Sequence, residues 1–175
     1  NAALHLPALA NEAGIKFTLE DVTNISKKTP YIADLKPGGK FVAKDLYKIG
    51  GVPVLIKALL DGGLLHGDCL TVTGKTLAEN HKNVIFPTDQ KIIYTTKKPL
   101  SNTGGFVGLK GNLAPDGAIV KVAGLKRNYF KGKAKCFDNE QSALNAVLDK
   151  KIKPGDVIVI RYEGPKGSPG MPEML

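Results

Sequence analysis

The residues best suited to do chemistry stand in the last stretch of the sequence, "RYEGPKGSPGMPEML" (161–175). From Gly164 onward, three glycines and three prolines surround one lysine, Lys166, and one carboxylate, Glu173. Glycines such as Gly164 and Gly167 let a backbone approach a ligand and present N–H groups to an anion, while prolines stiffen the loop. A lysine and a carboxylate there suit a substrate carboxylate and a hard divalent cation. An ordinary surface loop has the same composition, so the pattern alone leaves both interpretations open.

A second candidate is the cluster "HGDC" (66–69), which holds a histidine, a carboxylate and the thiol of Cys69. Its spacing matches no standard zinc pattern, and the chain's two cysteines, Cys69 and Cys136, are too few for a Cys₃ or Cys₄ site. We therefore expect neither to be a metal or cluster ligand, and we expect Cys136 to pack within a strand. His5 stands among leucines and is expected to be a core histidine.

Basic residues outnumber acidic ones, 25 against 16, for a formal net charge of +9. Such an excess attracts anions, and the run "KRNYFKGKAK" (126–135) places Tyr129 and Phe130 among cations, which is one way to bind single-stranded nucleic acid. A basic, β-rich nucleic-acid-binding domain is therefore an outside alternative. Lys133 and Lys135 also fall on the outward face of an expected strand, where solvation explains them. Because aromatic residues make up only 6% of the chain, we expect no nucleic-acid partner.

The overall composition is typical of a folded, reduced protein. A length of 175 residues suits one domain or two small ones, and 42% hydrophobic residues suffice for a core. No apolar run approaches the ~20 residues of a membrane span, so no membrane partner is expected. Two cysteines without a C-x-x-C pair indicate a reduced, intracellular compartment, and we expect a cytoplasmic protein. Dinucleotide-binding, Walker A, H-E-x-x-H and nucleophile-elbow motifs are absent from the sequence.

The first eighty residues have a helical pattern. "TLED" (18–21) resembles a capping box with Asp in place of Glu, and Val22 and Ile25 follow it on one face. "GGVPVLIKALLDGG" (50–63) predicts the clearest helix, with Pro53 in its first turn and two glycines at its end. Its apolar residues recur at helical spacing and predict one buried stripe, made of Val52, Leu55, Ile56, Leu59 and Leu60.

After about residue 83 the pattern changes to short β-rich runs. Strands are expected over 91–96, 105–111, 118–124, 133–137 and 157–162. The last is continuously apolar, which is typical of a strand buried on both faces. Within 133–137, Ala134 and Cys136 alternate with lysines, as in a half-buried strand.

One helix and one turn interrupt these strands. "DNEQSALNAVLD" (138–149) predicts a helix that Asp138 caps and to whose first residue Gln141 reaches back. The inner face of this helix is expected to be Ala143, Leu144, Val147 and Leu148. "GNLAP" (111–115), which contains Asn112, is expected to be a turn that feeds a strand.

Four segments together resemble the dihydroxy-acid dehydratase family of branched-chain amino-acid biosynthesis. They are "NAALHLPALANEAGI" (1–15), "GGVPVLIKALLDGGLLHGDCLTVTGKTLAEN" (50–80), "GNLAPDGAIVKVAGL" (111–125) and "KPGDVIVIRYEGPKGSPGMPEML" (153–175). They stand in the family's order and cover most of the chain. The last two are specific to a wider group that includes sugar-acid (aldonate) and phosphogluconate dehydratases, which are the alternative. "ADLKPGGKF" (33–41) and the length of the second segment favour the dihydroxy-acid members.

The resemblance implies an α/β fold in two parts. Residues 1–82 correspond to the C-terminal, helical part of the family's larger α/β domain. Residues 83–175 correspond to most of its swivelling β/β/α barrel-like domain, incomplete at the C-terminus. The chain is accordingly expected to be an internal-to-C-terminal fragment, inactive alone, because the family's cluster cysteines lie upstream and its proposed serine base lies downstream.

The family reaction is a hydro-lyase reaction that removes water from a 2,3-dihydroxy carboxylate and yields a 2-oxo acid. The resemblance implies two cofactors, an iron–sulfur cluster ([2Fe–2S] or [4Fe–4S]) that takes the 3-hydroxyl as a Lewis acid and a Mg²⁺ ion that holds the carboxylate and 2-hydroxyl. The cluster's ligands are expected outside this chain. The intact enzyme is expected to be a homodimer whose partner molecule is the small dihydroxy-carboxylate substrate.

The resemblance assigns roles to residues of the last segment. Glu173 is expected to be a Mg²⁺ ligand, because it matches the glutamate of the family's G-P-K-G-x-P-G-M-x-E motif. Gly164, Lys166 and Gly167 are expected to shape the same active-site loop, and Asn112 to face the same cleft. No residue of this chain is expected to be catalytic or to ligate the cluster.

Overall fold

The computed structural model describes residues 2–125, 127 and 129–164. Its contacts divide the chain into two compact units, residues 1–126 and 127–175. This division differs from the boundary at 82/83, which concerns the family's domains and stays a prediction. Each unit is described by itself.

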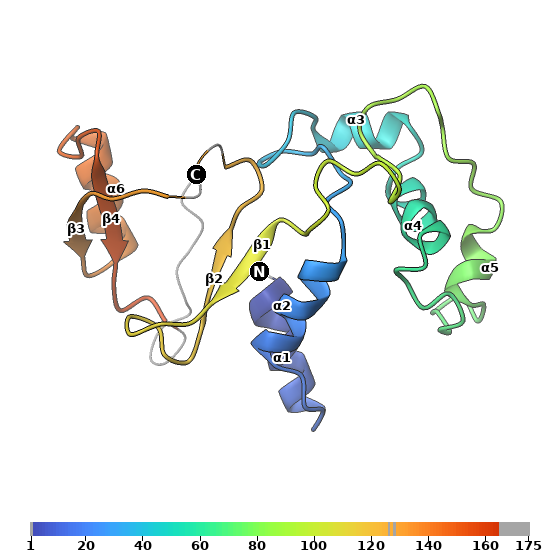
Figure 1. Cartoon of the computed structure of the whole chain (residues 1–175), viewed down its shortest axis with the longest axis horizontal. Coiled ribbons are helices and arrows are strands. Elements are labelled where there is room, and N and C mark those ends of the chain that lie inside the picture. Colours follow the sequence, from blue (N-terminus) through green and yellow to red (C-terminus); the bar gives the residue numbers. More distant parts are fainter. Residues whose placement is uncertain (1, 126, 128, 165–175) are drawn as a thin grey trace. The chain divides into compact units, whose positions relative to one another are not determined.

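The first unit joins five helices to one hairpin (Figure 1). The helices are α1 (Ala2–Glu12), α2 (Leu19–Lys28), α3 (Ala43–Lys48), α4 (Val52–Asp61) and α5 (Leu77–His81), and the strands are β1 (Phe106–Leu109) and β2 (Ala118–Lys121). The two strands pair antiparallel, with Phe106 opposite Lys121 and Leu109 opposite Ala118. Helix α2 packs against β1, and α1 packs against α2.

Helix α2 begins as its sequence predicts. The Thr18 hydroxyl accepts a hydrogen bond from the Asp21 N–H, and the Asp21 carboxylate accepts one from the Thr18 N–H, which completes the capping box. Val22 is buried, whereas Ile25, expected on the same face, is 54% exposed. The buried face continues instead through Thr23 and Ser26, because these small side chains allow the hairpin to approach.

The core of the first unit lies around α4. Its buried members are Ile32, Val54, Ala58, Ile92 and Ile93. The helix in 50–63 is confirmed with Pro53 in its first turn, but its stripe is rotated from the predicted one, because Val54 and Ala58 face the core while Val52 is 55% exposed. Leu55 and Leu59 pack against the same cluster, as predicted.

The expected strand over 91–96 does not form, and the side chain of Gln90 is the reason. Its carbonyl oxygen accepts hydrogen bonds from the N–H groups of Ile92 and Ile93 at 2.7 and 2.9 Å, and its amide nitrogen donates to the Ile93 carbonyl. These contacts use groups that a strand partner would need. One isolated bridge remains, between Ala33 and Ile93.

The second unit is a β–α–β segment made of β3 (Lys133–Phe137), α6 (Glu140–Leu148) and β4 (Asp156–Ile160). Strands β3 and β4 pair in parallel, with Lys133 opposite Asp156 and Phe137 opposite Ile160. Figure 1 shows α6 running alongside the strand pair, as a crossover between parallel strands requires.

Burial in the second unit is lower than the sequence predicts. Ala134 and Cys136 are exposed, β4 is only half-buried, and Val159 is 37% exposed. Among the described residues of this unit, the sheet has two strands and only α6 packs on it, so these residues do not cover either strand on both faces. In α6 the buried residues are Ala143 and Ala146, whereas the expected inner-face residues Val147 and Leu148 are exposed.

Both units mix helices with strands, in agreement with an α/β class. Within the described residues the strands form two separate two-stranded sheets and no closed barrel, so the barrel-like arrangement stays a prediction. No helix in this part of the chain is long and apolar enough to cross a membrane.

Candidate functional site

The structure describes two of the five predicted site residues. Gly164 is exposed and ends the described part of the second unit, just after β4. Asn112 is exposed in the loop between β1 and β2 of the first unit. Lys166, Gly167 and Glu173 lie outside the described residues.

The backbone that leads to Gly164 leaves the carboxyl end of β4. Because β3 and β4 are parallel, both carboxyl ends meet at one edge of the sheet, and the Arg161 N–H extends the ladder with a 2.8 Å hydrogen bond to the Phe137 carbonyl. Ligands of parallel α/β units bind outside this carboxyl edge. The start of the glycine- and proline-rich segment is therefore placed at the edge where such units bind ligands.

An ion pair fixes the first residue after β4. The Arg161 guanidinium donates from Nε to Asp138 Oδ1 at 2.8 Å, and its Nη2 also contacts that oxygen. Hydrogen bonding and charge attraction from Asp138 raise the pKa of Arg161 above its ordinary value. Both side chains are about half exposed, so water screens much of this attraction.

A second contact joins this segment to the N-terminus of α6. Glu163, which is half-buried, accepts a 2.7 Å hydrogen bond from the Glu140 N–H, which belongs to the first residue of the helix. Carboxylates are favourable there because the first N–H groups of a helix lack partners within it and carry partial positive charge.

The residues predicted to cap the N-terminus of α6 are not the ones that do so. Asn139, and not Asp138, is the N-cap, and its side chain accepts from the Ser142 N–H at 2.8 Å. Asp138 is instead paired with Arg161, and Gln141 bonds to Asn145 one turn further along. The sequence gives two adjacent residues that are both good caps, and only the position of Arg161 decides between them.

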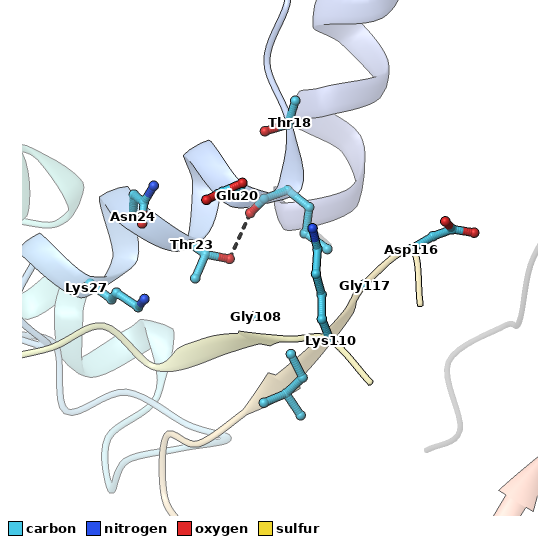
Figure 2. Close-up of a pocket in the computed structure, with 11 residues that line it drawn as sticks. Thr18, Glu20, Thr23, Asn24, Lys27, Gly108, Lys110, Asp116 and Gly117 are labelled. Atoms are coloured by element: carbon cyan, nitrogen blue, oxygen red, sulfur yellow. Dashed lines mark hydrogen bonds between the residues drawn. The ribbon is translucent and has the colours of Figure 1, made fainter. Parts of the chain in front are cut away.

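A hollow of ≈ 460 Å³ lies in the first unit between α2 and the hairpin (Figure 2). Its polar lining comes from α2 and its N-cap and from the hairpin end, namely Thr18, Glu20, Thr23, Asn24, Lys27, Lys110 and Asp116. The Thr23 hydroxyl is not free, because it donates to the Leu19 carbonyl at 2.8 Å, the dashed line of Figure 2.

Sequence reasoning did not predict this hollow. The available signal was Gly108, a glycine inside a strand. A Cβ at Gly108 would lie 2.2 Å from Thr23 Oγ1, so only glycine allows β1 to approach α2 so closely. Asn112 belongs to the same hairpin but does not line the hollow.

A smaller hollow of ≈ 360 Å³ in the same unit is lined by Tyr31, the buried Asp34 and a group of glycines. Burial and the nearby Asp34 charge raise the pKa of Tyr31 above its ordinary value. The Asp34 carboxylate accepts from the Lys40 N–H at 3.0 Å, so it closes the 33–41 loop.

The remaining candidate residues are all exposed. Cys69 and Cys136 are free thiols, and His66 is exposed beside the first of them. His5 is exposed on α1, so its assignment to the core is wrong, because α1 buries only Ala3. In the part of the chain that the structure describes, no three metal-ligating side chains gather into a possible ion site.

In the basic run, Tyr129 and Phe130 are 77% and 65% exposed. Lys133 and Lys135 are exposed on β3, as predicted, but so are Ala134 and Cys136, so the predicted alternation is absent. Two of the ten residues of this run, at positions 126 and 128, lie outside the described residues.

Two family models match the sequence. The model described as "Dihydroxy-acid/6-phosphogluconate dehydratase N-terminal" matches residues 1–80, and the model described as "Dihydroxy-acid/6-phosphogluconate dehydratase C-terminal" matches residues 91–175. Together they leave only 81–90 unmatched.

Curated relatives align with the whole chain. The dihydroxy-acid dehydratase of Pelagibacter ubique is 66% identical over 175 residues, and dihydroxy-acid dehydratase 2 of Bradyrhizobium diazoefficiens is 62% identical over 175 residues. The dihydroxy-acid dehydratase of Saccharolobus islandicus is 54% identical over 177 residues. In each case 100% of this chain is covered, but it spans only 30% to 32% of the relative's length.

Proposed function

The chain belongs to the dihydroxy-acid/6-phosphogluconate dehydratase family, and from this premise we propose that it is a segment of a dihydroxy-acid dehydratase. In this proposal the intact enzyme is a hydro-lyase that converts 2,3-dihydroxy carboxylates to 2-oxo acids in branched-chain amino-acid biosynthesis. The observation that carries the proposal is identity of 54% to 66% to relatives of that name across the whole chain. Cytoplasmic location and a homodimeric assembly belong to the same proposal.

The proposal assigns this chain one metal ligand, Glu173. The donor fits Mg²⁺, because that ion takes oxygen ligands and usually only one or two protein carboxylates. When bound, Mg²⁺ and an iron–sulfur cluster with ligands outside this chain would supply the Lewis acidity that a hydroxide leaving group needs. Glycines of the loop, Gly164 and Gly167 among them, would let the backbone approach the substrate.

The described residues give this loop a defined start. Asp138 and the N-terminus of α6 hold the chain between β4 and Gly164 through Arg161 and Glu163. In the proposal this places the loop's first residue at the carboxyl edge of a parallel pair, the usual binding edge of such units.

A chimera tests the proposal without the rest of this protein. The matching 175 residues of the Bradyrhizobium relative, which are 62% identical, are replaced by this chain. We expect dehydration of 2,3-dihydroxyisovalerate within about tenfold of the parent rate, since a tenfold loss corresponds to only about 1.4 kcal/mol of misfit.

The control is the same replacement with the Pelagibacter segment, whose source is 66% identical to this chain. If that graft is active and the graft of this chain is folded but inactive, the proposal is contradicted.

The alternative within the family is a sugar-acid or phosphogluconate dehydratase. It shares the metal chemistry, so only the substrate distinguishes the two. A panel of 2,3-dihydroxyisovalerate, an aldonate and 6-phosphogluconate, tested on the full-length enzyme that contains this chain, separates them. Preference for either sugar acid would move the assignment to the alternative.

Exposure of Tyr129 and Phe130 within a basic run is the specific observation that favours the outside alternative, single-strand nucleic-acid binding. Such binding falls steeply as salt rises, because phosphate contacts release counterions. Retention of the chain on heparin at low salt, together with binding of a single-stranded oligonucleotide that weakens in the Tyr129→Ala/Phe130→Ala variant, would support this activity. Absence of retention would remove it.

A further inference from the structure

The smaller hollow of the first unit contains a buried carboxylate. Asp34 is only 7% exposed, and it lines the hollow of ≈ 360 Å³ together with Tyr31 and Lys40. Its Oδ1 atom accepts a hydrogen bond from the Lys40 N–H at 3.0 Å, whereas no donor among the described residues bonds to its Oδ2 atom. Aspartates are rarely this buried unless a cation pairs with them.

The side chains around Asp34 do not supply that cation. Neither Asp34 nor Lys40 belongs to an ion pair within the described residues, and the Lys40 side chain is exposed. Burial, and then the nearby Asp34 charge, raise the pKa of Tyr31 above its ordinary value, so the phenol keeps its proton. The carboxylate therefore meets a neutral hydroxyl and a backbone N–H, but no partner of opposite charge in the described chain.

The rest of the wall is made of glycines and apolar side chains. They are Gly38, Gly104, Gly105, Gly124, Leu100, Val122 and Ala123. A Cβ at Gly38 would lie 3.2 Å from the Tyr31 hydroxyl oxygen and 3.1 Å from the Ala123 Cβ, so this glycine keeps the space beside the phenol open. A hollow of this size is too large for a bare ion, and apolar walls with a few polar groups are typical of sites for small organic ligands.

We propose that this hollow binds a small organic molecule through an ammonium group that pairs with the Asp34 carboxylate. The apolar residues contact the hydrocarbon part of the ligand, and Lys40 accepts a carboxylate where the ligand has one. The inference does not depend on the proposed function, because it uses only described residues of the first unit. If Asp34 served only to close the 33–41 loop, its Oδ1 bond would be explained, but the hollow would have no affinity for amines.

Three related probes test the proposal on the full-length enzyme that contains this chain. L-2-Aminobutyrate carries both charged groups, propylamine lacks the carboxylate, and butyrate lacks the ammonium. Such small ligands bind weakly, so saturation-transfer NMR titrations are the appropriate measurement. Both ammonium probes are expected to bind, and butyrate is not. The proposal is overturned if neither ammonium probe binds, as would happen if the Lys40 ammonium itself paired with Asp34, or if butyrate binds as well as they do.

Asp34→Asn tests the residue that carries the proposal. The amide keeps an oxygen that can accept from the Lys40 N–H, but it lacks the charge. Propylamine should therefore bind about tenfold more weakly or worse, since hydrogen bonds to charged groups are the strong ones. Asp89→Asn is the matched control, because it removes the same charge from an exposed residue that does not line the hollow. Equal binding by the two variants would mean that propylamine is attracted without a defined site.

A second pair of variants keeps the test valid if Asp34→Asn fails to fold. Gly38→Ala places a methyl group beside the Tyr31 hydroxyl and should weaken propylamine binding about fivefold or more, because the ligand and the methyl group compete for the same space. Gly111→Ala is its control, since a Cβ there meets nothing within 4 Å. Unchanged binding in a folded Gly38→Ala enzyme would place the ligand elsewhere and overturn the proposal.

The same titrations distinguish amino acids from simple amines as the ligand class. Tighter binding of L-2-aminobutyrate than of propylamine, lost in Lys40→Met, identifies an amino acid whose carboxylate Lys40 accepts. Equal or weaker binding of L-2-aminobutyrate identifies an amine without a carboxylate. Either result supports the ammonium site at Asp34.

Discussion

The two units of this chain are held together in different ways. Of the buried apolar residues in the described chain, seven belong to residues 1–126, and the second unit contributes only Ala143 and Ala146. The second unit depends more on strand pairing and on polar contacts such as those of Arg161 and Glu163. The segment with the proposed metal ligand belongs to the second, less buried unit. Packing and proposed chemistry therefore lie in different parts of the chain, and substitutions should separate them.

The largest expected effect is on activity. In the full-length enzyme, Glu173→Gln should lower the dehydration rate about 100-fold or more, because the amide lacks the charge that a hard cation prefers. The free energy of unfolding should change by less than about 0.5 kcal/mol. Asp149→Asn, which removes an exposed ion pair with Lys151, is the control and should leave the rate unchanged. If the Glu173→Gln enzyme keeps the parent rate, the claim that the proposed chemistry lies in the second unit is contradicted.

The next effect is on stability and belongs to the first unit. Ile93 is 2% exposed in the core, so Ile93→Ala should lower the free energy of unfolding by about 2–5 kcal/mol. Leu148→Ala in the second unit removes a side chain that is 68% exposed and should cost less than about 0.5 kcal/mol. Urea unfolding of the chain, followed by circular dichroism, measures both. Equal costs would mean that the packing difference does not determine stability.

A smaller effect is expected where the hairpin meets α2. Gly108→Ala should cost about 1–3 kcal/mol, because the new Cβ would lie 2.2 Å from Thr23 Oγ1. Adding Thr23→Ala removes that oxygen, so the double variant should be less destabilised than the sum of the single variants. Gly111→Ala is the matched control, since a Cβ there meets nothing within 4 Å. If the stability costs of Gly108→Ala and Thr23→Ala are strictly additive, the contact between these two positions does not cause the destabilisation.

The capping box of α2 gives a smaller change again. Thr18→Ala removes the side chain that accepts from the Asp21 N–H and should cost about 1 kcal/mol. Thr29→Ala, at the other end of the helix, is the comparison, because its hydroxyl only donates to the Ile25 carbonyl. A thermal melt that ranks Thr29→Ala below Thr18→Ala in stability would reverse this expectation.

The smallest expected effect depends on pH. Hydrogen bonds from the Thr18 hydroxyl and N–H lower the pKa of Asp21 below its ordinary value of 3.8. The ionised form therefore contributes stability above pH 3.8, and this contribution is lost as pH falls through the lowered pKa. The stability difference between the parent and Asp21→Asn should shrink over that range of pH. A difference that stays constant would show that the charge of Asp21 is not involved.

Local signals in the sequence predicted the elements well where one residue type determines the outcome. Thr18 and Asp21 start α2, and Pro53 starts α4, as expected from their positions. The hairpin strands, β3 and α6 also form within their predicted ranges, and β4 begins one residue before its predicted range, at Asp156. The expected strand at Ile93 failed through a local side-chain contact, because Gln90 took hydrogen bonds that the strand would have used.

The candidate site was predicted through the family's motif, but the contacts that hold the start of its loop were not predicted. Composition alone did not separate an active-site loop from a surface loop, and only the resemblance assigned Glu173 a role. The anchors of the loop were not foreseen because they join residues 23 positions apart, Asp138 with Arg161 and Glu140 with Glu163. A left-handed Tyr162 was also unpredictable, since tyrosine carries no local preference for that conformation.

The central claim is that the loop after β4 supplies a carboxylate to a metal ion. A crystal structure of the full-length enzyme with Mg²⁺ tests it most directly. The account predicts an oxygen of Glu173 at about 2.0–2.1 Å from the ion, with the loop leaving β4 through the turn at Tyr162. A structure in which Mg²⁺ is bound by other residues and the Glu173 side chain lies in solvent would contradict it.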